Sequence, residues 1–435
     1  MSQHERGFSP ILRNRYFLFL WIAQALSQTA YNGIHFVQMI MIERLTRSSG
    51  HMGLMILAFS LPGVLFSTVA GVVVDRLPNK LVMVTSNGLR VLTAVSYIVF
   101  LHTLGGLHLL AVIYAITFIA STIGQFFAPA ELATIPLLVG GEGLLAANSL
   151  FNLTLTASQV VGFILLFPSL VKLGGQRGLD LSFAVIALMY AAAMALVALL
   201  PRDVPGLQDN PQASPLKRAW AEVREGWAFV SSHSSIYLAV LQLTLVAALV
   251  MVMAMLAPGF ATRVLGMQPE DAVYIFAPAG VGIFLATFLV GRFGHHFSRE
   301  SLINAGLMTM GLTLGALAFV GRVGGPVSMP LLEAYPEATV SLTSAMMGLA
   351  FFLGLELGLI SIPAQTILQE RSPLEIRGRV LAVQFMLANL VGIPPLLFIG
   401  ALADRIGIPR VTLLISVGVL LAGGISIYYA QKERN

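Results

Sequence analysis

The sequence predicts an all-α membrane protein whose twelve transmembrane helices form two pseudo-symmetric six-helix bundles. Two observations predict this class. Hydrophobic residues make up 57% of the 435-residue chain and charged residues only 10%. Long apolar stretches separated by short polar loops fill almost the whole chain. Each is close to the roughly 20 residues that a helix needs to cross a bilayer, and a soluble core helix is rarely so long and so apolar.

The expected spans follow one another with short connections. In the first half of the chain they cover 16–42, 52–74, 81–103, 108–128, 142–170 and 181–200. In the second half they cover 236–262, 270–291, 301–320, 341–368, 379–402 and 410–430. The longest polar stretch lies between the two sets. We therefore expect an N-terminal bundle at 1–200, a linker at 201–235 and a C-terminal bundle at 236–435.

The expected linker has two parts. Residues 201–215 are rich in Pro and Asp. In 216–230, apolar residues that include Trp220 and Trp227 recur at helical spacing, with charged residues between them. This pattern is typical of an amphipathic helix on a membrane surface. It predicts a cytoplasmic tether between the halves, and a docking site for a regulator is the alternative.

The distribution of basic residues predicts the orientation of the helices. If both termini are cytoplasmic, 17 of the 25 Lys and Arg residues are assigned to the inner side. Cytoplasmic loops of membrane proteins carry such an excess. Residues 1–6 are polar and are not followed by the pattern of a cleavable signal peptide. We expect a multi-pass protein of the cell (inner) membrane with both termini in the cytoplasm.

Several function classes have no basis in the sequence. The chain has no Cys, which excludes disulfides, thiol catalysis and Cys-ligated metals. It shows no phosphate-binding Gly-Lys-Ser/Thr loop, no convincing metal-ligand spacing and no catalytic triad. The net charge of +5 is small and does not indicate nucleic-acid binding. We expect a monomer that is not an enzyme and needs no cofactor, with a small-molecule substrate and the lipid bilayer as its partners.

The two halves share short segments at a nearly constant separation. Pro129–Glu131 corresponds to Pro363–Gln365, with two of three residues identical. Gly143–Ala146 and Gly378–Ala382 open the fifth and eleventh expected helices with related sequences. A six-plus-six duplication within the membrane is the sequence sign of a transporter built from two related bundles.

A charged loop follows the second expected helix on the inner side. It contains Gly71, Asp75, Arg76 and Lys80. These residues match the cytoplasmic signature of the major facilitator superfamily, Gly-x-x-x-Asp-Arg-x-Gly-Arg-Arg/Lys, which the loop resembles, although the two residues before Lys80 depart from it. A small residue such as Gly71 also lets two helices approach closely. In the family this loop holds the inner face closed, so the resemblance implies an inner-gate role for these four residues.

Two further segments share parts of this signature. Gly291–Arg299 has His295 in place of the acid, which indicates either a degenerate copy in a solvated loop or a pH-sensing histidine pair. Gly400–Gly407, with Asp404, is a closer match. Because it is expected on the outer side, we interpret it as a helix-closing turn.

Longer segments resemble one branch of the superfamily, the drug exporters typified by bacterial macrolide-efflux proteins. They include Arg13–Phe17, Gln24–Gln28, Ala147–Ser149 and Gln369–Val380. The branch also includes siderophore exporters, and a related lysophospholipid transporter shares segments like Leu368–Arg371. The first helix lacks the acid that the branch usually carries after Ser-Gln. The resemblance spans essentially the whole chain and implies secondary transport.

Charged residues within the expected spans are costly in hydrocarbon and are therefore candidates for function. Glu356 lies near the middle of the tenth span, where an acid tends to take up a proton. It is a candidate for proton coupling, for binding a cationic substrate or for pairing with a nearby base. Arg90, in the third span, could form a buried ion pair or bind an anionic group. Glu131, near the inner end of the fourth helix, and Arg379, at the start of the eleventh, are assigned to the inner gate.

Uncharged polar residues recur along the first expected helix at steps of three and four, which places them on one face. They are Gln24, Gln28, Asn32, His35 and Gln38. Of these we expect Gln28 and Asn32 to lie deepest. Asn152 on the fifth helix and Gln384 on the eleventh are further candidates. Such groups either line a wet cavity or form interhelical hydrogen bonds.

The predicted function is secondary active transport by alternating access, with export of amphipathic small molecules or drugs. The predicted substrate or proton pathway comprises Gln28, Asn32, Arg90, Glu356, Asn152 and Gln384. Within transport, the alternative is a lysophospholipid or siderophore carrier. Outside transport, the alternative is a membrane receptor that moves no substrate.

Overall fold

The computed structural model describes residues 11–74, 76–201, 215–323 and 336–432. Within these ranges the chain is helical almost throughout and contains no strand. A segment that crosses a bilayer must satisfy its backbone hydrogen bonds internally, and a helix does so within one segment. The prediction of an all-α membrane protein is confirmed.

The helices follow one another in the predicted order. The first half of the chain contains α2 (Arg15–Thr46), α3 (Ser49–Val74), α4 (Asn79–Thr103), α5 (Gly106–Gln159), α6 (Phe167–Leu173) and α7 (Gly178–Ala198). The second half contains α8 (Pro215–Ser232), α9 (Ser234–Gly259), α10 (Ala272–Phe276), α11 (Pro278–Phe293), α12 (Arg299–Val323), α14 (Pro336–Arg371), α15 (Leu374–Ile406) and α16 (Ile408–Lys432). Eleven segments of the described ranges are long and apolar enough to cross a membrane, and α2 is the twelfth span.

α2 differs from the other spans in polarity rather than in length. Its 32 residues are more than enough to cross the hydrocarbon core. Its polar face, which runs from Gln24 to Gln38, makes the helix less apolar than the eleven other spans. Because polar groups are costly next to lipid tails, we expect this face to point towards other helices.

The structure corrects the predicted boundary between the fourth and fifth spans. We expected a break between residues 128 and 142, but the helix continues through Pro129 and Pro136. The interruption falls at Gly140, whose φ of 64° is accessible to a residue without a Cβ atom. The two predicted spans are therefore the two arms of α5. The second arm continues through a π-helical segment, Val160–Leu166, into α6.

The eighth predicted span is divided as well. A 3₁₀ turn at Pro269–Asp271 leads into the short helix α10. One residue, Ala277, separates the end of α10 from the start of α11. Pro278 occupies the first turn of α11. Proline fits this place because its missing amide hydrogen would have no partner there.

The chain folds into two compact units. Unit 1 comprises Met1–Leu45 and Leu57–Pro215, and unit 2 comprises Thr46–Ile56 and Leu216–Asn435. The segment Thr46–Ile56, which includes the start of α3, therefore belongs to unit 2. The domain limits expected from the sequence remain a prediction.

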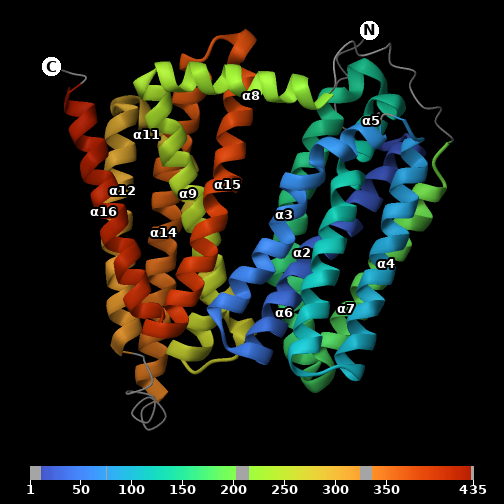
Figure 1. The fold of residues 1–435 in the computed structure, drawn as a ribbon, viewed down its shortest axis with the longest axis horizontal. Coiled ribbons are helices and arrows are strands. Elements are labelled where there is room, and N and C mark those ends of the chain that lie inside the picture. The colour runs from blue at the N-terminus through green and yellow to red at the C-terminus, as the bar shows by residue number, and fades with distance from the viewer. Residues whose placement is uncertain (1–10, 75, 202–214, 324–335, 433–435) are drawn as a thin grey trace. The chain divides into compact units, whose positions relative to one another are not determined.

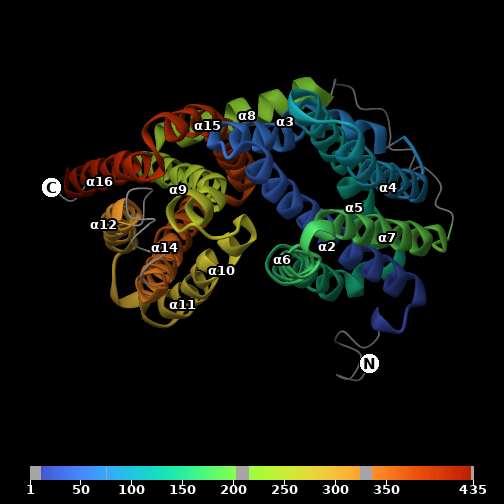
Figure 2. The same cartoon turned by 90° about the horizontal axis from the view of Figure 1, so that it is seen from below.

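In unit 1, α4 lies beside both α5 and α7 (Figure 2). The ring of Tyr97 on α4 stacks on that of Phe183 on α7, with centroids 4.7 Å apart. Phe17 of α2 and Phe127 of α5 belong to one cluster of buried apolar side chains. Lipid tails are as apolar as these side chains, so close packing is what holds such helices together.

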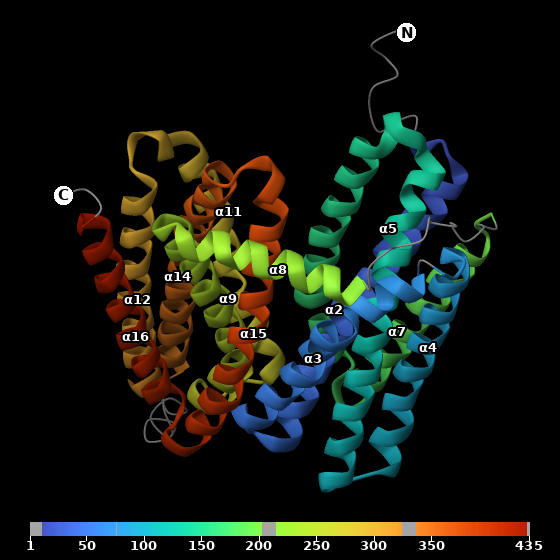
Figure 3. The ribbon, with the colours of Figure 1, turned by 45° about the horizontal axis from the view of Figure 1, so that its top comes forward.

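In unit 2, α12 packs against α14 and α16, and α11 packs against α14 (Figure 3). Glycines permit the closest approach between α11 and α14. A Cβ atom at Gly354 would overlap the backbone of Ala279, and one at Gly282 would overlap the backbone of Phe351. Small residues at helix crossings in membranes allow this kind of contact.

α8 runs crosswise to α9 and α15 of the same unit (Figure 1). It contains the segment that the sequence predicts to be an amphipathic helix. Arg379 of α15 forms an ion pair with Glu225 of α8, and a Cβ atom on Gly226 would lie 2.7 Å from the Arg379 carbonyl oxygen. The crosswise orientation is the one expected for a helix on a membrane surface, and its placement there remains a prediction.

Candidate functional site

A buried arginine lies at the centre of the candidate site in unit 1. Arg90 is near the middle of α4, and only 6% of its surface is exposed. Its Cζ atom lies 4.5 Å from the ring centroid of Phe127 and 5.5 Å from that of Tyr190. A guanidinium over an aromatic face is attracted by the ring electrons, most strongly where water is excluded. The two rings therefore replace part of the hydration that Arg90 loses.

The Arg90 side chain has no acidic partner in contact. Among the described residues, no carboxylate lies within 4 Å of its guanidinium, and it donates no hydrogen bond to them. Gly124 of α5 lies beside the guanidinium, because a Cβ atom placed on Gly124 would be 3.5 Å from Arg90 Nη2. The buried ion pair considered from the sequence is therefore not formed among these residues.

A small cavity lies beside Arg90. Polar side chains of four helices line it, namely Tyr31, His35 and Gln38 of α2, Arg90 and Thr93 of α4, Thr117 and Ser121 of α5, and Tyr190 of α7. Ligand sites in proteins combine an enclosed space with a few convergent polar groups. The volume of the cavity, about 10 Å³, has room for one water molecule. Polar groups in a membrane-spanning bundle are costly without a partner, so this hydratable cavity marks the candidate functional site of unit 1.

The hydroxyl groups around the cavity differ in what they offer a ligand. Thr93, Thr117 and Ser121 donate their protons to backbone carbonyl oxygens at 2.8, 2.7 and 2.5 Å, respectively. The hydroxyls of Tyr31 and Tyr190 form no hydrogen bond with the described residues. Because a hydroxyl carries a single proton, the two tyrosines are the hydroxyl donors that remain for a ligand.

His35 and Gln38 add polar atoms without partners. The His35 ring packs against the rings of Tyr31 and Phe59, with centroid distances of 4.5 and 3.9 Å. Neither of its nitrogens has a hydrogen bond of normal geometry within the described part of the chain. Gln38 donates from Nε2 to the Tyr97 hydroxyl at 2.6 Å, whereas its Oε1 has no such partner. Buried polar atoms are rarely left without partners, so a ligand or water is expected to complete these bonds.

Glu131 is a second buried charged residue of unit 1. It lies in the first arm of α5, is 4% exposed, and its Oε1 has no partner among the described atoms. It forms no ion pair with Arg90. From the sequence we expect Glu131 in the inner gate, and this role remains a prediction.

Glu356 is a deeply buried acid of unit 2. It lies on α14, is 3% exposed, and its Oε1 accepts a hydrogen bond of 2.7 Å from Thr313 of α12. Its Oε2 has no hydrogen bond of normal geometry within the described part of the chain, and no base of the described residues pairs with it. The pairing with a base that the sequence allowed is therefore not formed among these residues. A carboxyl group with one open oxygen can take up and release a proton there.

The other predicted pathway residues are not among those that line the cavity. Asn32 donates from its side chain to the Gln28 carbonyl oxygen of its own helix at 2.8 Å. Asn152 is exposed on the second arm of α5. Gln384 of α15 is 6% exposed, and its Oε1 has no partner among the described atoms. Their place in a transport pathway remains a prediction.

The loop predicted to form the inner gate has one anchored basic residue. Lys80 donates from Nζ to the Leu200 carbonyl oxygen at 2.5 Å, just after the C-terminal end of α7, where a positive charge is favourable. Arg76 is exposed, and no described atom lies within 4 Å of a Cβ atom placed on Gly71. The close helix approach expected at Gly71 is therefore not seen here. Asp75 lies outside the described residues, and the gate role of this loop remains a prediction.

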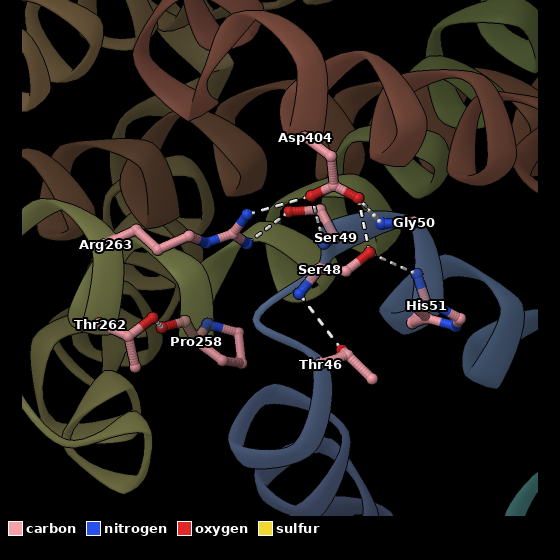
Figure 4. A network of polar contacts seen from close by, with 9 residues as sticks. All are labelled: Thr46, Ser48, Ser49, Gly50, His51, Pro258, Thr262, Arg263 and Asp404. Carbon is pink, nitrogen blue, oxygen red and sulfur yellow. Dashed lines mark hydrogen bonds and ion pairs between the residues drawn. The ribbon is translucent and has the colours of Figure 1, made fainter. Parts of the chain in front are cut away.

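Asp404 of unit 2 has a role that is not apparent from the sequence. The predicted helix-closing turn is confirmed, because α15 ends here with Gly407 at a φ of 89°. Asp404 in addition accepts three hydrogen bonds from the start of α3 (Figure 4). The donors are the Ser48 hydroxyl at 2.6 Å, the Ser49 amide at 2.7 Å and the Gly50 amide at 2.9 Å.

Arg263 completes this network. Its Nη1 lies 3.1 Å from Asp404 Oδ1, and its Nη2 donates to the Ser49 hydroxyl at 2.6 Å. Asp404 therefore caps the N-terminus of α3, where free amides and the helix dipole favour a negative charge. The pair of serines before α3 is a typical start signal for a helix, but its acidic partner lies 355 residues away from Ser49.

Comparison with known protein families and sequences gives consistent matches over nearly the whole chain. The family model described as Major Facilitator Superfamily matches residues 20–394. The multidrug efflux pump Tap of Mycolicibacterium fortuitum is 24% identical over 419 residues, which cover 94% of this chain and 95% of the pump. Macrolide efflux protein A of Streptococcus pyogenes is 25% identical over 408 residues, which cover 90% of each chain.

Solved structures show the same fold at low sequence identity. A mutant of the nucleoside transporter NupG matches with a TM-score of 0.70 at 14% identity, over 95% of this chain and 99% of that one. A bacterial homologue of the iron transporter ferroportin, in its inward-facing state, matches with a TM-score of 0.66 at 15% identity, over 95% and 98% of the two chains. These likenesses concern the fold alone.

Proposed function

The chain belongs to the Major Facilitator Superfamily, and on this basis we propose that it is a secondary transporter that exports amphipathic small molecules, including drugs, by alternating access. The observation that carries the proposal is the family match over residues 20–394, which includes spans of both units. Two similar proteins are efflux pumps that align over 90% or more of their length. This supports export as the direction of transport.

Alternating access requires polar groups inside the membrane that a substrate or a proton reaches from one side and leaves towards the other. The cavity beside Arg90 in unit 1 provides such groups. In unit 2, Oε2 of Glu356, which has no hydrogen bond with the described atoms, is a further polar group of this kind. We assign substrate contact to Arg90 and proton coupling to Glu356.

Transport in proteoliposomes tests the function directly. The purified chain is reconstituted, and accumulation of three amphipathic dyes, one anionic, one neutral and one cationic, is measured with and without an imposed pH gradient. We expect accumulation of at least one dye that depends on the protein and is increased by the gradient. If none of the three moves faster than in empty liposomes, the proposed function is wrong.

Glu356→Gln tests the coupling role. The substitution keeps the size and hydrogen bonding of the side chain but removes its ability to exchange a proton. We expect it to abolish accumulation driven by the gradient, while exchange of substrate without net proton movement survives. Thr313→Val is the matched control because it removes the hydrogen bond to Glu356 but leaves the acid. Gradient-driven accumulation by a well-folded Glu356→Gln protein would rule out coupling through this residue.

Single cysteines in this Cys-free chain test the orientation. We propose that both termini are cytoplasmic, which places Ser232 on the inner side and Gln268 on the outer side; both residues are exposed. A membrane-impermeant maleimide added to intact cells should label Gln268→Cys and leave Ser232→Cys unlabelled until the cells are opened. The opposite labelling pattern would reverse the orientation.

A further inference from the structure

A six-residue pattern, Gly-x-x-x-Asp-Arg, occurs twice in the chain. The inner copy, residues 71–76, follows the end of α3, and the outer copy, residues 400–405, lies at the end of α15. Because α15 continues to Ile406, the glycine and the acid of the outer copy are one turn apart on the same side of the helix. A glycine beside an acid permits a close helix approach that charge can hold.

The outer copy is in close contact with the start of α3. A Cβ atom on Gly400 would lie 2.6 Å from the carbonyl oxygen of Ser49 and 3.1 Å from the Cα atom of Gly50. Backbones come this close only where a side chain is absent. On the same side of α15, Asp404 accepts a hydrogen bond of 2.7 Å from the Ser49 amide, and Arg263 pairs with Asp404 at 3.1 Å (Figure 4).

The inner copy makes no such contact at its glycine. No described atom lies within 4 Å of a Cβ atom placed on Gly71. The same pattern is therefore found in two situations, against a neighbouring helix at the outer copy and without a close neighbour at the glycine of the inner copy. This difference is expected if the two copies form their contacts in alternation, as the two sides of an alternating-access transporter do.

We propose that the outer copy is a releasable clasp, formed by Gly400, Asp404 and Arg263 on the start of α3, which closes and opens with the outer side of the transporter. This inference rests on the proposed alternating access and adds the contact that closes the outer side. The residues that the clasp holds belong to unit 2, whereas α3 from Leu57 onwards belongs to unit 1. The two bundles of such a transporter rock against each other, so α3 either leaves the clasp or bends.

The chemistry of the clasp suits repeated release. The side chains of Asp404 and Arg263 are 29% and 24% exposed. Water can therefore replace their ion pair and hydrogen bonds when these break, so the net cost of release is modest. The free amides and the dipole at the start of a helix attract an acid, which favours renewed closure when α3 returns.

Two other roles of the same contact predict different results. If Asp404 is only a helix cap, its removal weakens the start of α3 and leaves the inner side of the protein unchanged. If α3 instead bends at Pro62, which lies inside the helix shortly after the segment held by the clasp, the clasp stays closed throughout transport. Crosslinking and labelling separate these two roles from the proposed one.

Crosslinking tests whether release is required. Ser48→Cys and Asp404→Cys are introduced together into the Cys-free chain, because Ser48 Oγ lies 2.6 Å from a carboxylate oxygen of Asp404. A short bifunctional methanethiosulfonate joins the pair in proteoliposomes, and dithiothreitol removes it. We expect the crosslink to lower dye accumulation to the level of empty liposomes and dithiothreitol to restore it. Full accumulation by the crosslinked protein would overturn the inference and favour bending of α3.

The matched control for the crosslink is Arg299→Cys with Glu370→Cys. These residues form a surface ion pair between α12 and α14, within unit 2. The same reagent should join them without a change in dye accumulation.

Labelling tests the connection between the two sides without transport of any dye. Met52 is buried in the first turn of α3 and Leu77 is exposed beside the inner copy, so Met52→Cys reports on the outer side and Leu77→Cys on the inner side. Asp404→Asn keeps the shape of the side chain but removes its charge. We expect an impermeant maleimide outside the cells to label Met52→Cys about tenfold faster in this background, since charge-assisted bonds are lost. Labelling of Leu77→Cys in inside-out vesicles should become slower, because the inner side closes as the outer side opens.

The two rates change in opposite directions only if the clasp alternates with the inner side. Faster labelling at position 52 with an unchanged rate at position 77 would identify a simple cap and overturn the inference. The control is Arg405→Gln, which removes the exposed neighbour of Asp404 in the same pattern and should change neither rate. If Asp404→Asn does not fold, Arg263→Gln, which breaks the same ion pair, takes its place.

Failure of the proposed function is distinguishable from failure of the clasp. If no dye is transported but the two labelling rates change in opposite directions, the proposed export is wrong and the clasp stands. If dyes are transported but Asp404→Asn changes neither rate, the clasp is wrong and the proposed transport stands. If the cysteine pair at positions 48 and 404 does not join, the labelling rates decide alone.

Discussion

Arg90 in unit 1 and Asp404 in unit 2 are both charged residues of membrane-spanning helices, but their surroundings are opposite. Asp404 receives hydrogen bonds from a hydroxyl, two backbone amides and the guanidinium of Arg263 (Figure 4). Arg90 has two aromatic rings beside it and no contacting acid among the described residues. The charge of Asp404 is therefore saturated, in the sense that the protein supplies its hydrogen bonds. The charge of Arg90 has no hydrogen bond with the described residues.

The difference teaches how to separate structural charges from functional ones within a single transporter. Removal of a saturated charge leaves several donors without an acceptor, which costs stability. Removal of an unsaturated buried charge relieves a desolvation cost, so a hydrophobic replacement is often tolerated. Stability should therefore depend more strongly on Asp404 than on Arg90.

Asp404→Ala should have the largest effect on stability. It removes the acceptor of two amides at the start of α3 and breaks the ion pair with Arg263. The Asp404 side chain is 29% exposed, so water replaces part of the lost bonding. We expect the free energy of unfolding to fall by about 1–2 kcal/mol, measured by thermal unfolding in one detergent. The control is Glu370→Ala, which breaks a surface ion pair that is worth about 0–1 kcal/mol. Equal losses in both variants would contradict the assigned role of Asp404.

Ser48→Ala should have a smaller effect at the same place. The Ser48 hydroxyl donates to Asp404 and accepts from the His51 amide at 3.1 Å, as a helix-capping serine does. Its loss should lower the free energy of unfolding by about 0.5–1 kcal/mol. The same substitution in the Asp404→Ala background should cost less, because the two residues share one hydrogen bond. Strict additivity of the two losses would show that they act separately.

Arg90→Met should have the smallest effect on stability. Methionine retains much of the apolar stem and its contact with the rings of Phe127 and Tyr190, while the buried charge disappears. We expect the free energy of unfolding to change by less than about 1 kcal/mol, and it can increase. A loss of stability larger than that of Asp404→Ala would reverse the comparison between the two charges.

Much of the fold follows from the sequence because membrane spans are local features. The apolar length of each span predicts the all-α class, and the six-plus-six pattern predicts two related bundles. The sequence did not predict that α5 continues through Pro129 and Pro136 to Gly140. A proline usually interrupts a helix, but neighbouring groups in a bundle can satisfy the backbone that it frees.

The candidate site was only partly predictable. The helical period placed five polar side chains on one face of α2, and Gln28 and Asn32 were ranked first. The cavity instead uses His35 and Gln38, while Asn32 bonds to the backbone of its own helix. The helical period shows which residues share one face of α2, but it does not show which neighbouring helices cover that face. Where along that face a cavity remains depends on how α4, α5 and α7 pack against it.

The sequence by itself determined the class, the number of spans and the presence of charged residues within them, because hydrophobic length and residue type are properties of a local stretch of chain. Only the tertiary structure decided which of those charges are satisfied. Asp404 finds its partners 355 residues away at Ser49, and Arg90 finds rings from two other helices instead of an acid. Hydrogen bonds and electrostatic contacts act over a few ångströms, so the role of a buried charge follows from the side chains that packing places around it.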